Sequence, residues 1–497
     1  MAIPDGSGGV FTATGGWDWY GALLINHLGA DGQSVPPWPA DGAKIWITSG
    51  PEPNGLVAPN SPDADQGAGP GDIMPSIALD GSGGLLVSWT HVGRASQAVH
   101  VMQLTSSGTP APGWPANGVL LRPTYENQWV SCVCSDGDGG AIVAWYDEPG
   151  IIMADHMMAG GSVDARWPSG GLFVSDPTHT SEAPALVPDG HGGCFIAWQQ
   201  GDANGAEHPT LQHLLTDGSL APGWSLYGRT LTGLQSEAGA FRIYGGAPFR
   251  YSSAIADGSG GIIVAWSTIV NGSGQVYVQR VLADGSVAPT WPATGYAVAP
   301  DAFDQRLPCV APDGTGGAFV AWQQGPGGSI YNEILVQRVD GSGSVARDWP
   351  RAGYQQAAGP GSRSHPVAVS DGAGGAIVAW EENDGGTANI FASRAAPGTT
   401  STPRAGPTSA FSLAGFRPNP SLAASLHVAF ELATSEPATL ELMDVTGRLI
   451  LKKEVGGFGP GAHMVSLEAP RSSPPGIYWV CLRQAGRELT TRGAMIR

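Results

Sequence analysis

Charged residues are scarce in this 497-residue chain, and positive ones are the scarcer kind. Only 13% of the residues are charged, and 24 Lys and Arg stand against 42 Asp and Glu, which gives a formal charge of −18. Nucleic acid and anionic membrane surfaces need a basic face, so we exclude both as partners. No apolar run approaches the roughly 18 residues of a membrane span. The first residues, MAIPDGSGG, lack the basic and apolar segments of a signal peptide.

Cysteine is also rare, and its spacing indicates no metal or redox chemistry. The chain has five Cys, and the close pair Cys132 and Cys134 has no second pair with which to form a zinc site. We expect buried apolar thiols rather than a disulfide framework. The 11 His show no metal spacing, and no hydrolase, metalloprotease or phosphate-loop motif occurs. We therefore predict no catalytic residue, no metal and no cofactor.

Glycine is abundant, with 75 residues, and much of it lies in a repeat. The phrase Asp-Gly-x-Gly-Gly, followed by an apolar run that usually ends in Trp, occurs seven times. It begins at Asp5, Asp80, Asp136, Asp189, Asp257, Asp313 and Asp371. A second phrase, Trp usually followed by Pro, recurs between these turns. Such a period, at about 55 residues, is typical of β-propeller blades rather than of sandwich arrays or solenoids.

Each repeat predicts four strands. In the unit of Asp313, residues 307–312 and 318–324 form a hairpin around the glycine turn, and strands at 334–340 and 354–358 follow. The second strand is an unbroken apolar run, which indicates a sheet covered on both faces. We therefore predict an all-β fold, with residues 1–395 as a seven-bladed β-propeller.

The two ends of the repeat array differ from its middle. The first unit has only a short first strand, and the last unit has no Trp-Pro phrase and no evident fourth strand. We expect the natural precursor to begin upstream of Met1, with a signal peptide and the missing strand. The alternative is that residues 405–414 fold back and supply that strand.

The C-terminal part of the chain has a different pattern. Residues 396–415 are rich in Pro, Ser, Thr, Gly and Ala, as a linker is. Residues 416–497 alternate polar and apolar in short strands at 426–432, 439–445, 449–455, 462–469, 476–484 and 489–496. This pattern predicts a small antiparallel sandwich of the immunoglobulin-like class.

Three motifs in this part follow one another in a familiar order. They are RPNP at 417–420, DVTGR at 444–448 and PGIYWVCLRQAG from Pro475. The combination resembles the C-terminal sorting domain of type IX secretion substrates, which is similar to the flagellar hook-cap immunoglobulin-like domain. The resemblance implies a secreted or cell-surface protein, with the secretion machinery as the partner of residues 416–497. It covers about 80 residues and assigns nothing to the rest of the chain.

Candidate binding residues lie where the repeats differ from one another. The positions six to eight residues before each turn Asp enter the first strand at the rim opposite the turns. Three consecutive units place an arginine at or beside this level, and earlier units add a carboxylate and an indole. The set is Arg250, Arg306, Arg363, His365, Glu182 and Trp129. Convergent guanidinium groups suit a carboxylate or sulfate.

Two functions fit these patterns. The first is an extracellular binding protein whose ligand is a glycan, with acidic glycans among the candidates, or a protein. The alternative is a sialidase-like glycoside hydrolase or a polysaccharide lyase, with Glu182 or Glu382 and Asp147 as its acid and base. Regular repeats without a catalytic motif favour the binding protein.

Overall fold

The fold is described from a computed structural model, and its described part consists of strands and their connections. It covers residues 1–15, 23–29, 31, 33–39, 42–45, 71–92, 97–122, 127–201, 207–231, 254–270, 273–299, 304–325, 331–358, 362–383, 388–396, 411–416, 421–422, 426–434, 436–456, 461–467, 470 and 473–496. Within these residues no helix occurs, so the all-β prediction is confirmed. None of them forms a helix long and apolar enough to cross a membrane.

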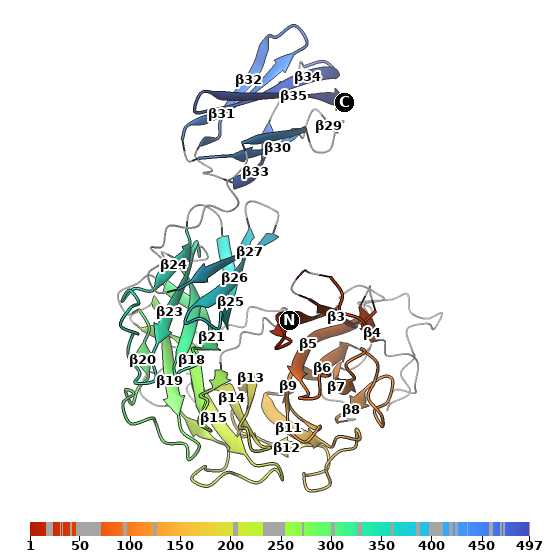
Figure 1. Ribbon diagram of the computed structural model, residues 1–497, viewed down its shortest axis with the longest axis vertical. Helices are drawn as coiled ribbons and strands as arrows, with labels where there is room; N and C mark the ends of the chain where they lie inside the picture. Colours follow the sequence, from red (N-terminus) through yellow and green to blue (C-terminus); the bar gives the residue numbers. More distant parts are fainter. Residues whose placement is uncertain are drawn as a thin grey trace.

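Seven antiparallel sheets follow one another along residues 2–395, one for each glycine turn. The first three sheets are β1 (Ala2–Pro4), β2 (Val10–Thr14), β3 (Leu23–Leu28) and β4 (Ala43–Ile45); β5 (Gly71–Leu79), β6 (Leu85–Val92), β7 (Gln97–Leu104) and β8 (Val119–Leu120); and β9 (Gln128–Ser135), β10 (Ala141–Asp147), β11 (Ile151–Met157) and β12 (Leu172–Phe173). The fourth and fifth are β13 (Ser181–Pro188), β14 (Cys194–Gly201), β15 (Glu207–Leu214) and β16 (Arg229–Thr230); and β17 (Ala254–Ala256), β18 (Ile262–Val270), β19 (Ser273–Val281) and β20 (Tyr296–Ala297). The last two are β21 (Asp304–Pro312), β22 (Ala318–Gly325), β23 (Glu333–Val339) and β24 (Tyr354–Ala357); and β25 (Ser362–Ser370), β26 (Ala376–Asn383) and β27 (Ala388–Ala395). Figure 1 shows them in chain order around an arc, with β1–β4 and β25–β27 at its two ends.

The glycine turns form because the carboxylate of their aspartate accepts backbone N–H groups of the turn, in place of backbone carbonyls. In the unit of Asp313, one carboxylate oxygen accepts the backbone N–H groups of Thr315 and Gly317 at 2.7 and 2.8 Å. Gly314 and Gly316 have φ of 77° and 88°, where a side chain would strain the backbone. The same pair of bonds recurs in all seven turns.

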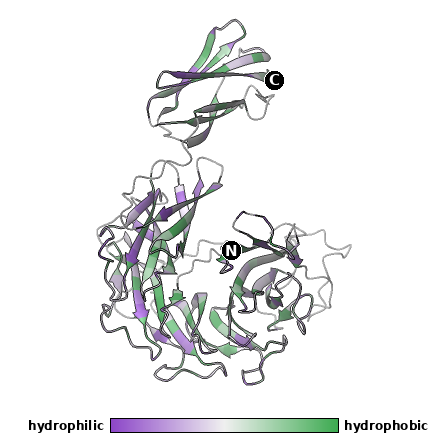
Figure 2. Cartoon of the chain, in the orientation of Figure 1, coloured by the Kyte–Doolittle hydropathy of each residue, from purple (hydrophilic) through white to green (hydrophobic). Residues whose placement is uncertain are grey.

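Each sheet packs its apolar faces against the neighbouring sheets of the array. Figure 2 shows hydrophobic residues, in green, along these strands. The tryptophans that end the second strands of six sheets are all buried, as predicted: Trp89, Trp145, Trp198, Trp266, Trp322 and Trp380. All five cysteines are buried and free, which confirms the absence of a disulfide framework.

The second set of tryptophans joins one sheet to the next. The Trp291 indole of the β17–β20 sheet donates a hydrogen bond to the Gly341 carbonyl of the following sheet, at 3.1 Å. Its ring also covers Gly343, which has φ of 79°. The equivalent bonds run from Trp114 to Ala159, from Trp167 to Thr216 and from Trp224 to Ala283. The Trp-Pro phrase therefore serves packing between sheets.

The last sheet differs from the other six in having three strands among the described residues. Its side that faces away from β21–β24 exposes apolar residues: Ile390 is 77% exposed, and Val367, Val369 and Ile377 are also exposed. The alternative in which residues 405–414 complete this sheet is not what the described residues show. Strand β28 (Ser412–Phe416) pairs with β30 in the C-terminal part instead, and residues 405–410 lie outside the described residues.

The C-terminal part has two sheets that share one apolar core. One sheet contains β28, β30 (Leu426–Leu432) and β33 (Gly461–Leu467). The other contains β29 (Ser421–Leu422), β31 (Ala438–Asp444), β32 (Leu449–Glu454), β34 (Gly476–Gln484) and β35 (Arg487–Ile496). The six strands predicted here all occur. The predicted linker ends earlier than expected, because residues 412–415 already belong to β28.

Candidate functional site

The rim that carries the glycine turns is saturated with internal hydrogen bonds. The second carboxylate oxygen of every turn Asp accepts a bond from the third strand of its own sheet, from His27, Gln103, His156, His213, Arg280, Arg338 or Arg394. A feature that recurs in every sheet with its partners inside that sheet serves folding. We therefore look for a ligand site at the other rim.

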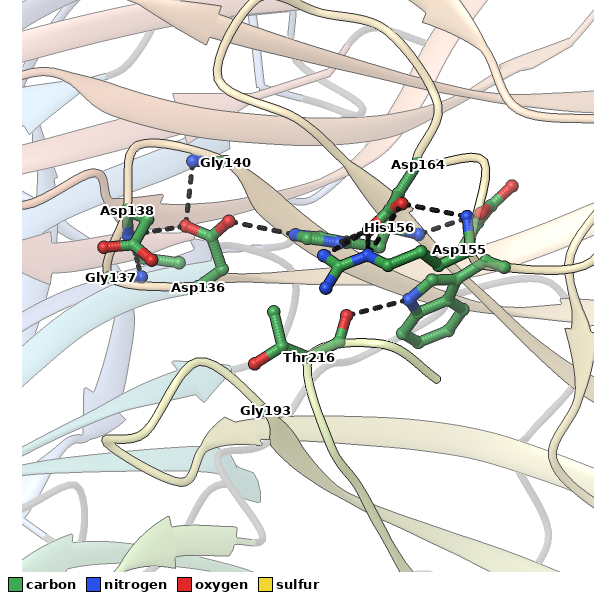
Figure 3. A network of polar contacts seen from close by, with 12 residues as sticks. Asp136, Gly137, Asp138, Gly140, Asp155, His156, Asp164, Gly193 and Thr216 are labelled. Atoms are coloured by element: carbon green, nitrogen blue, oxygen red, sulfur yellow. Dashed lines mark hydrogen bonds and ion pairs between the residues drawn. The ribbon is translucent and has the colours of Figure 1, made fainter. Parts of the chain in front are cut away.

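The third sheet shows how completely this rim is bonded (Figure 3). The His156 ring is buried between two carboxylates, with Nε2 2.9 Å from Asp136 and Nδ1 2.9 Å from Asp164. Arg166 in turn pairs with Asp164. Burial alone would lower the pKa of His156, but its hydrogen bonds to the two carboxylates outweigh burial and raise that pKa. The charges of His156, Asp136, Asp164 and Arg166 are therefore paired within the network.

At the opposite rim, five first strands carry the same backbone distortion. The residue six positions before the turn Asp is not glycine yet has a positive φ, between 49° and 58°: Met74, Val130, Ala183, Leu307 and His365. A break in strand register accompanies it in each of these sheets. Strained residues and β-bulges concentrate at functional sites, where they redirect the neighbouring side chain. The residues redirected in this way include the predicted Trp129, Glu182 and Arg306.

These distorted strand ends lie on the inner side of the arc. The first strands of adjacent sheets contact one another, as β5 with β9, β9 with β13 and β21 with β25 do. In Figure 1 these strands line the concave side. Side chains from neighbouring sheets are therefore brought together at this rim.

The predicted arginines are engaged by carboxylates of the chain. Arg306 pairs with Asp304 at 3.1 Å, and Arg363 forms two hydrogen bonds with Glu382, at 2.6 and 3.1 Å. Arg363 is buried and also donates to the Asn332 carbonyl. His365 pairs with Glu381 at 3.0 Å. Of these contacts, the bond from Arg363 to Asn332 joins the last two sheets, and the others lie within one sheet.

Arg250 lies outside the described residues. Arg363 and Arg306 differ in their position relative to the second strand of their own sheet. Arg306 lies opposite Gln323, whereas Arg363 lies opposite Glu382, one residue further along its second strand. The expected convergence of three free guanidinium groups is therefore absent from the described part of this rim. Ion-paired arginines have little charge left for an anion.

Trp129 and Glu182 belong to a different group, formed by the third and fourth sheets. We name the β9–β13 cluster as Trp129, Tyr146, Glu148, Glu182 and Gln199. Tyr146 lies directly opposite Trp129, and Gln199 directly opposite Glu182, so each pair projects to one side of its sheet. Tyr146 packs on the core between the third and fourth sheets, whereas Gln199 shares the side of Ala197, which faces the fifth sheet. The backbone N–H of Ser181 donates to the Gly150 carbonyl at 2.8 Å, which holds the turn after Glu148 against the start of β13.

The polar groups of this cluster are incompletely bonded. Glu148 accepts from Asn127 at 2.8 Å and from the Trp129 indole at 3.4 Å. By contrast, the amide nitrogen of Gln199 has no hydrogen-bond partner, although the residue is only 9% exposed. The hydroxyl of the fully buried Ser181, next to Glu182, has none either. Buried polar groups without partners cost about 1–3 kcal/mol each. Ser181 lies opposite Gln200, so its hydroxyl and the Gln199 amide point to opposite faces of the fourth sheet.

Burial and neighbouring carboxylates change the pKa of two members of the cluster. Burial raises the pKa of Tyr146, and the carboxylates of Glu182, Glu148 and Asp147 raise it further. Burial also raises the pKa of Glu182. Asp147 is held by Arg122 at 2.8 Å. Trp129, Tyr146 and Glu148 thus lie together at the third sheet, and Glu182 and Gln199 lie on the side of the fourth sheet that faces the fifth.

Repeat alignment identifies the rim and two members of this cluster, and it places Tyr146, Glu148 and Gln199 at the loops of the same rim. It gives no signal for the distorted backbone, because the five residues concerned share no residue type. It also gives none for the unbonded Ser181 hydroxyl. No group of three or more metal-ligating side chains lies within the described residues.

Comparisons with known proteins find solved structures with a low degree of similarity to this chain. No family model matches the chain. No curated protein matches it either. Among solved structures, a subtype N10 neuraminidase-like protein of A/little yellow-shouldered bat/Guatemala has a TM-score of 0.34 and 10% identity over 65% of this chain and 93% of that one.

Two further structures are alike to a similar degree. The Aleuria aurantia lectin, a six-bladed β-propeller, has a TM-score of 0.32 and 11% identity over 66% of this chain and 98% of that chain. An endo-arabinase from Bacteroides thetaiotaomicron has a TM-score of 0.29 and 11% identity over 65% and 93%. Scores this low carry no argument about function, so the function has to be inferred from the residues of this chain.

Proposed function

We propose that this protein binds a glycan through the β9–β13 cluster. The observation that carries the proposal is the pairing of Trp129 with Tyr146 on neighbouring strands beside Glu148, which accepts the Trp129 indole N–H at 3.4 Å. Aromatic faces pack on the apolar face of a sugar ring, and carboxylates and amides bond its hydroxyls. The remaining arginine-rich end of the rim is internally paired and contributes structure.

The first experiment is a glycan array followed by calorimetric titration of the best ligand. Replacement Trp129→Ala removes the larger aromatic surface and is expected to weaken binding at least tenfold, since such anchors contribute about 2 kcal/mol or more. The matched control is Trp479→Ala, which removes a partly exposed indole from β34 in the C-terminal part. Equal affinity of the Trp129→Ala variant and the wild type would rule this site out.

A hydrolase is the second candidate, and one observation favours it. Glu148 and Glu182 lie at neighbouring strand ends of this rim, where the Ser181 backbone N–H donates to the Gly150 carbonyl at 2.8 Å. Burial raises the pKa of Glu182, as is needed for a general acid. Turnover of the bound glycan that Glu182→Gln abolishes while binding persists would establish this activity. Binding without turnover in the wild type would leave a lectin.

The architecture and export of the protein are part of the same proposal. We infer that the seven sheets are the blades of a β-propeller and that residues 416–497 are an immunoglobulin-like domain that directs export to the cell surface. Support comes from the seven repeated sheets, from the two-sheet C-terminal core and from the DVTGR turn, whose Asp444 accepts the Thr446 and Arg448 backbone N–H groups. Fusing residues 397–497 to a reporter tests this, because retention of the reporter inside a type IX-competent cell would refute it.

A further inference from the structure

We propose that residues 411–413 are a shared strand, which pairs with β30 in the structure and can instead complete the last sheet of the array beside β27. The inference is independent of the proposed glycan site. It concerns the outer edge of β27, with which no described strand pairs. It assigns to that edge an occupant from the same chain.

The outer edge of β27 is open and apolar. Phe391 lies opposite Trp380 and is 45% exposed, whereas its counterpart Leu335, opposite Trp322, is 5% exposed. The difference arises because β24 pairs with Leu335, while no described strand lies on that side of Phe391. Edge strands with unpaired backbone groups and apolar side chains are templates for a further strand. The edge of β27 therefore fits a short extended segment.

The length of the connection after the third strand identifies which segment fits. In all six four-stranded sheets the fourth strand begins 15 residues after the third strand ends: from Leu28 to Ala43, Leu104 to Val119, Met157 to Leu172, Leu214 to Arg229, Val281 to Tyr296 and Val339 to Tyr354. Strand β27 ends at Ala395, so the same spacing places a fourth strand from residue 410 onwards.

The register of the other sheets also fixes which residues would meet. In the β17–β20 sheet Tyr277 lies opposite Ala297, and the next N–H, of Val298, donates to the Val276 carbonyl at 3.0 Å. Counted from the ends of the strands, the same register places Phe411 opposite Phe391 and Ser412 opposite Ile390. Directly opposed aromatic side chains stabilise a strand pair. The segment therefore offers Phe391 a partner ring.

In the structure the C-terminal part holds this segment. Ser412 and Leu413 lie opposite residues of β30, and Phe411 is buried in the C-terminal core. The guanidinium carbon of Arg487 lies 4.6 Å from the centre of the Phe411 ring, and this cation–π contact favours the β30 pairing. Release would uncover Phe411 there and cover Phe391 at β27. The two pairings thus exchange similar apolar contacts.

A break within β28 separates this segment from the rest of the strand. The register with β30 shifts between Leu413 and Gly415, and Gly415 has φ of 79°. Beyond the break, Phe416 lies opposite Val428 and is buried in the same core. Residues 411–413 can therefore leave β30 while Phe416 stays in place. The exchange needs only the first half of β28 to move.

Cysteine trapping in the full-length chain tests the alternative pairing. Ile390→Cys/Ser412→Cys brings two thiols within disulfide reach when the segment completes the last sheet. The matched control, Asn389→Cys/Ser412→Cys, moves one thiol to the neighbouring exposed residue, which projects to the other face of β27. With oxidised glutathione as the oxidant, we expect the intramolecular disulfide to form about tenfold faster in the first variant, because disulfides require opposed Cβ atoms. Peptide mass spectrometry identifies the linkage and separates it from the five buried native cysteines.

The contact between Arg487 and Phe411 provides a second, independent measurement. Adding Arg487→Ala to the Ile390→Cys/Ser412→Cys variant should raise the trapping rate about two- to fivefold, since it removes the cation–π contact that favours β30. The matched control is Arg483→Ala, which removes a guanidinium paired with Glu441 and Glu488 instead. This control should leave the trapping rate unchanged.

Three results would overturn the proposal. The first is equal trapping in the two double variants, or none in either. The second is a trapping rate that Arg487→Ala does not change. The third is a covalent dimer in place of the intramolecular disulfide, which would show that the edge of β27 pairs with a second copy. Thermal unfolding before oxidation should match the wild type, because Ile390, Asn389 and Ser412 are exposed or only partly buried.

Discussion

At the scale of single residues, Asp155 departs from a pattern that three other sheets share. The equivalent residues in three sheets are Gln212, Gln279 and Gln337, which accept the next backbone N–H and donate to a carbonyl near the Trp-Pro phrase. Asp155 accepts the His156 N–H at 2.9 Å, but its other carboxylate oxygen is buried without a hydrogen-bond partner. An ionised carboxylate cannot donate, so the bridge made by glutamine is lost.

We predict that Asp155→Gln stabilises the protein at neutral pH. Burial raises the pKa of Asp155 to about 6, so the folded state holds this proton more tightly than the unfolded state does. The penalty appears as the pH rises from about 4 to about 6 and is complete above that, on the order of 2 kcal/mol. Denaturant unfolding at pH 7.5 and pH 4.5 should show the larger gain at pH 7.5.

The companion variant Asp155→Asn removes the charge without the reach of glutamine. It should recover the pH-dependent part of the gain and none of the bridging bond. A wild-type protein whose stability relative to Asp155→Asn is the same at both pH values would contradict the assignment of a raised pKa. Burial is the main cause of the raised pKa; His156 opposes it and Asp164 adds to it, and both belong to the network in Figure 3.

At the scale of elements, the contact between a tryptophan and a turn glycine is what joins one sheet to the next. Five such contacts occur, with a built Cβ on the glycine lying 2.8–3.2 Å from the nearest ring atom: Gly108 with Trp38, Gly161 with Trp114, Gly218 with Trp167, Gly285 with Trp224 and Gly343 with Trp291. Each glycine also has a positive φ. A side chain there would both strain the turn and push the neighbouring sheet away.

Two glycines of one sheet separate these effects. Gly314→Ala strains a turn with φ of 77° in open space and should cost about 1–2 kcal/mol. Gly343→Ala, at φ of 79°, brings its Cβ within 2.8 Å of Trp291 and should cost a further 1–3 kcal/mol or so. Chemical denaturation measures both. Equal losses for the two variants would show that the contact with Trp291 does not join the sheets.

At the scale of the whole molecule, the array of sheets has one uncovered end. Ile334 and Ile390 occupy equivalent positions on the third strands of the last two sheets, opposite Gln323 and Glu381. Ile334 is fully buried by the β25–β27 sheet, while Ile390 is 77% exposed. The first sheet offers Val10 and Thr12 on its own outward side, and both are only partly buried. The two ends of the arc therefore each leave one sheet face partly free.

This difference predicts unequal costs for the same substitution. Ile334→Ala should destabilise the protein by about 2–5 kcal/mol, because it opens a cavity in a closed core. Ile390→Ala should cost less than about 1 kcal/mol, since its side chain is already in water. Urea unfolding curves of the two variants provide the measurement. A loss at Ile390 as large as that at Ile334 would mean that another surface, such as the first sheet, covers this face in solution.

Local sequence determined the repeated unit of this protein. Each strand pair and turn is short-range, so Asp-Gly-x-Gly-Gly with its apolar run was enough to predict the hairpins, the buried tryptophans and the six main C-terminal strands. The ligand site depended on contacts between units. Which arginines are neutralised, where the backbone takes a positive φ, and which neighbouring sheet each rim residue faces all follow from how adjacent sheets are placed. Those placements result from packing between residues far apart in the chain, and one repeat read by itself does not encode them.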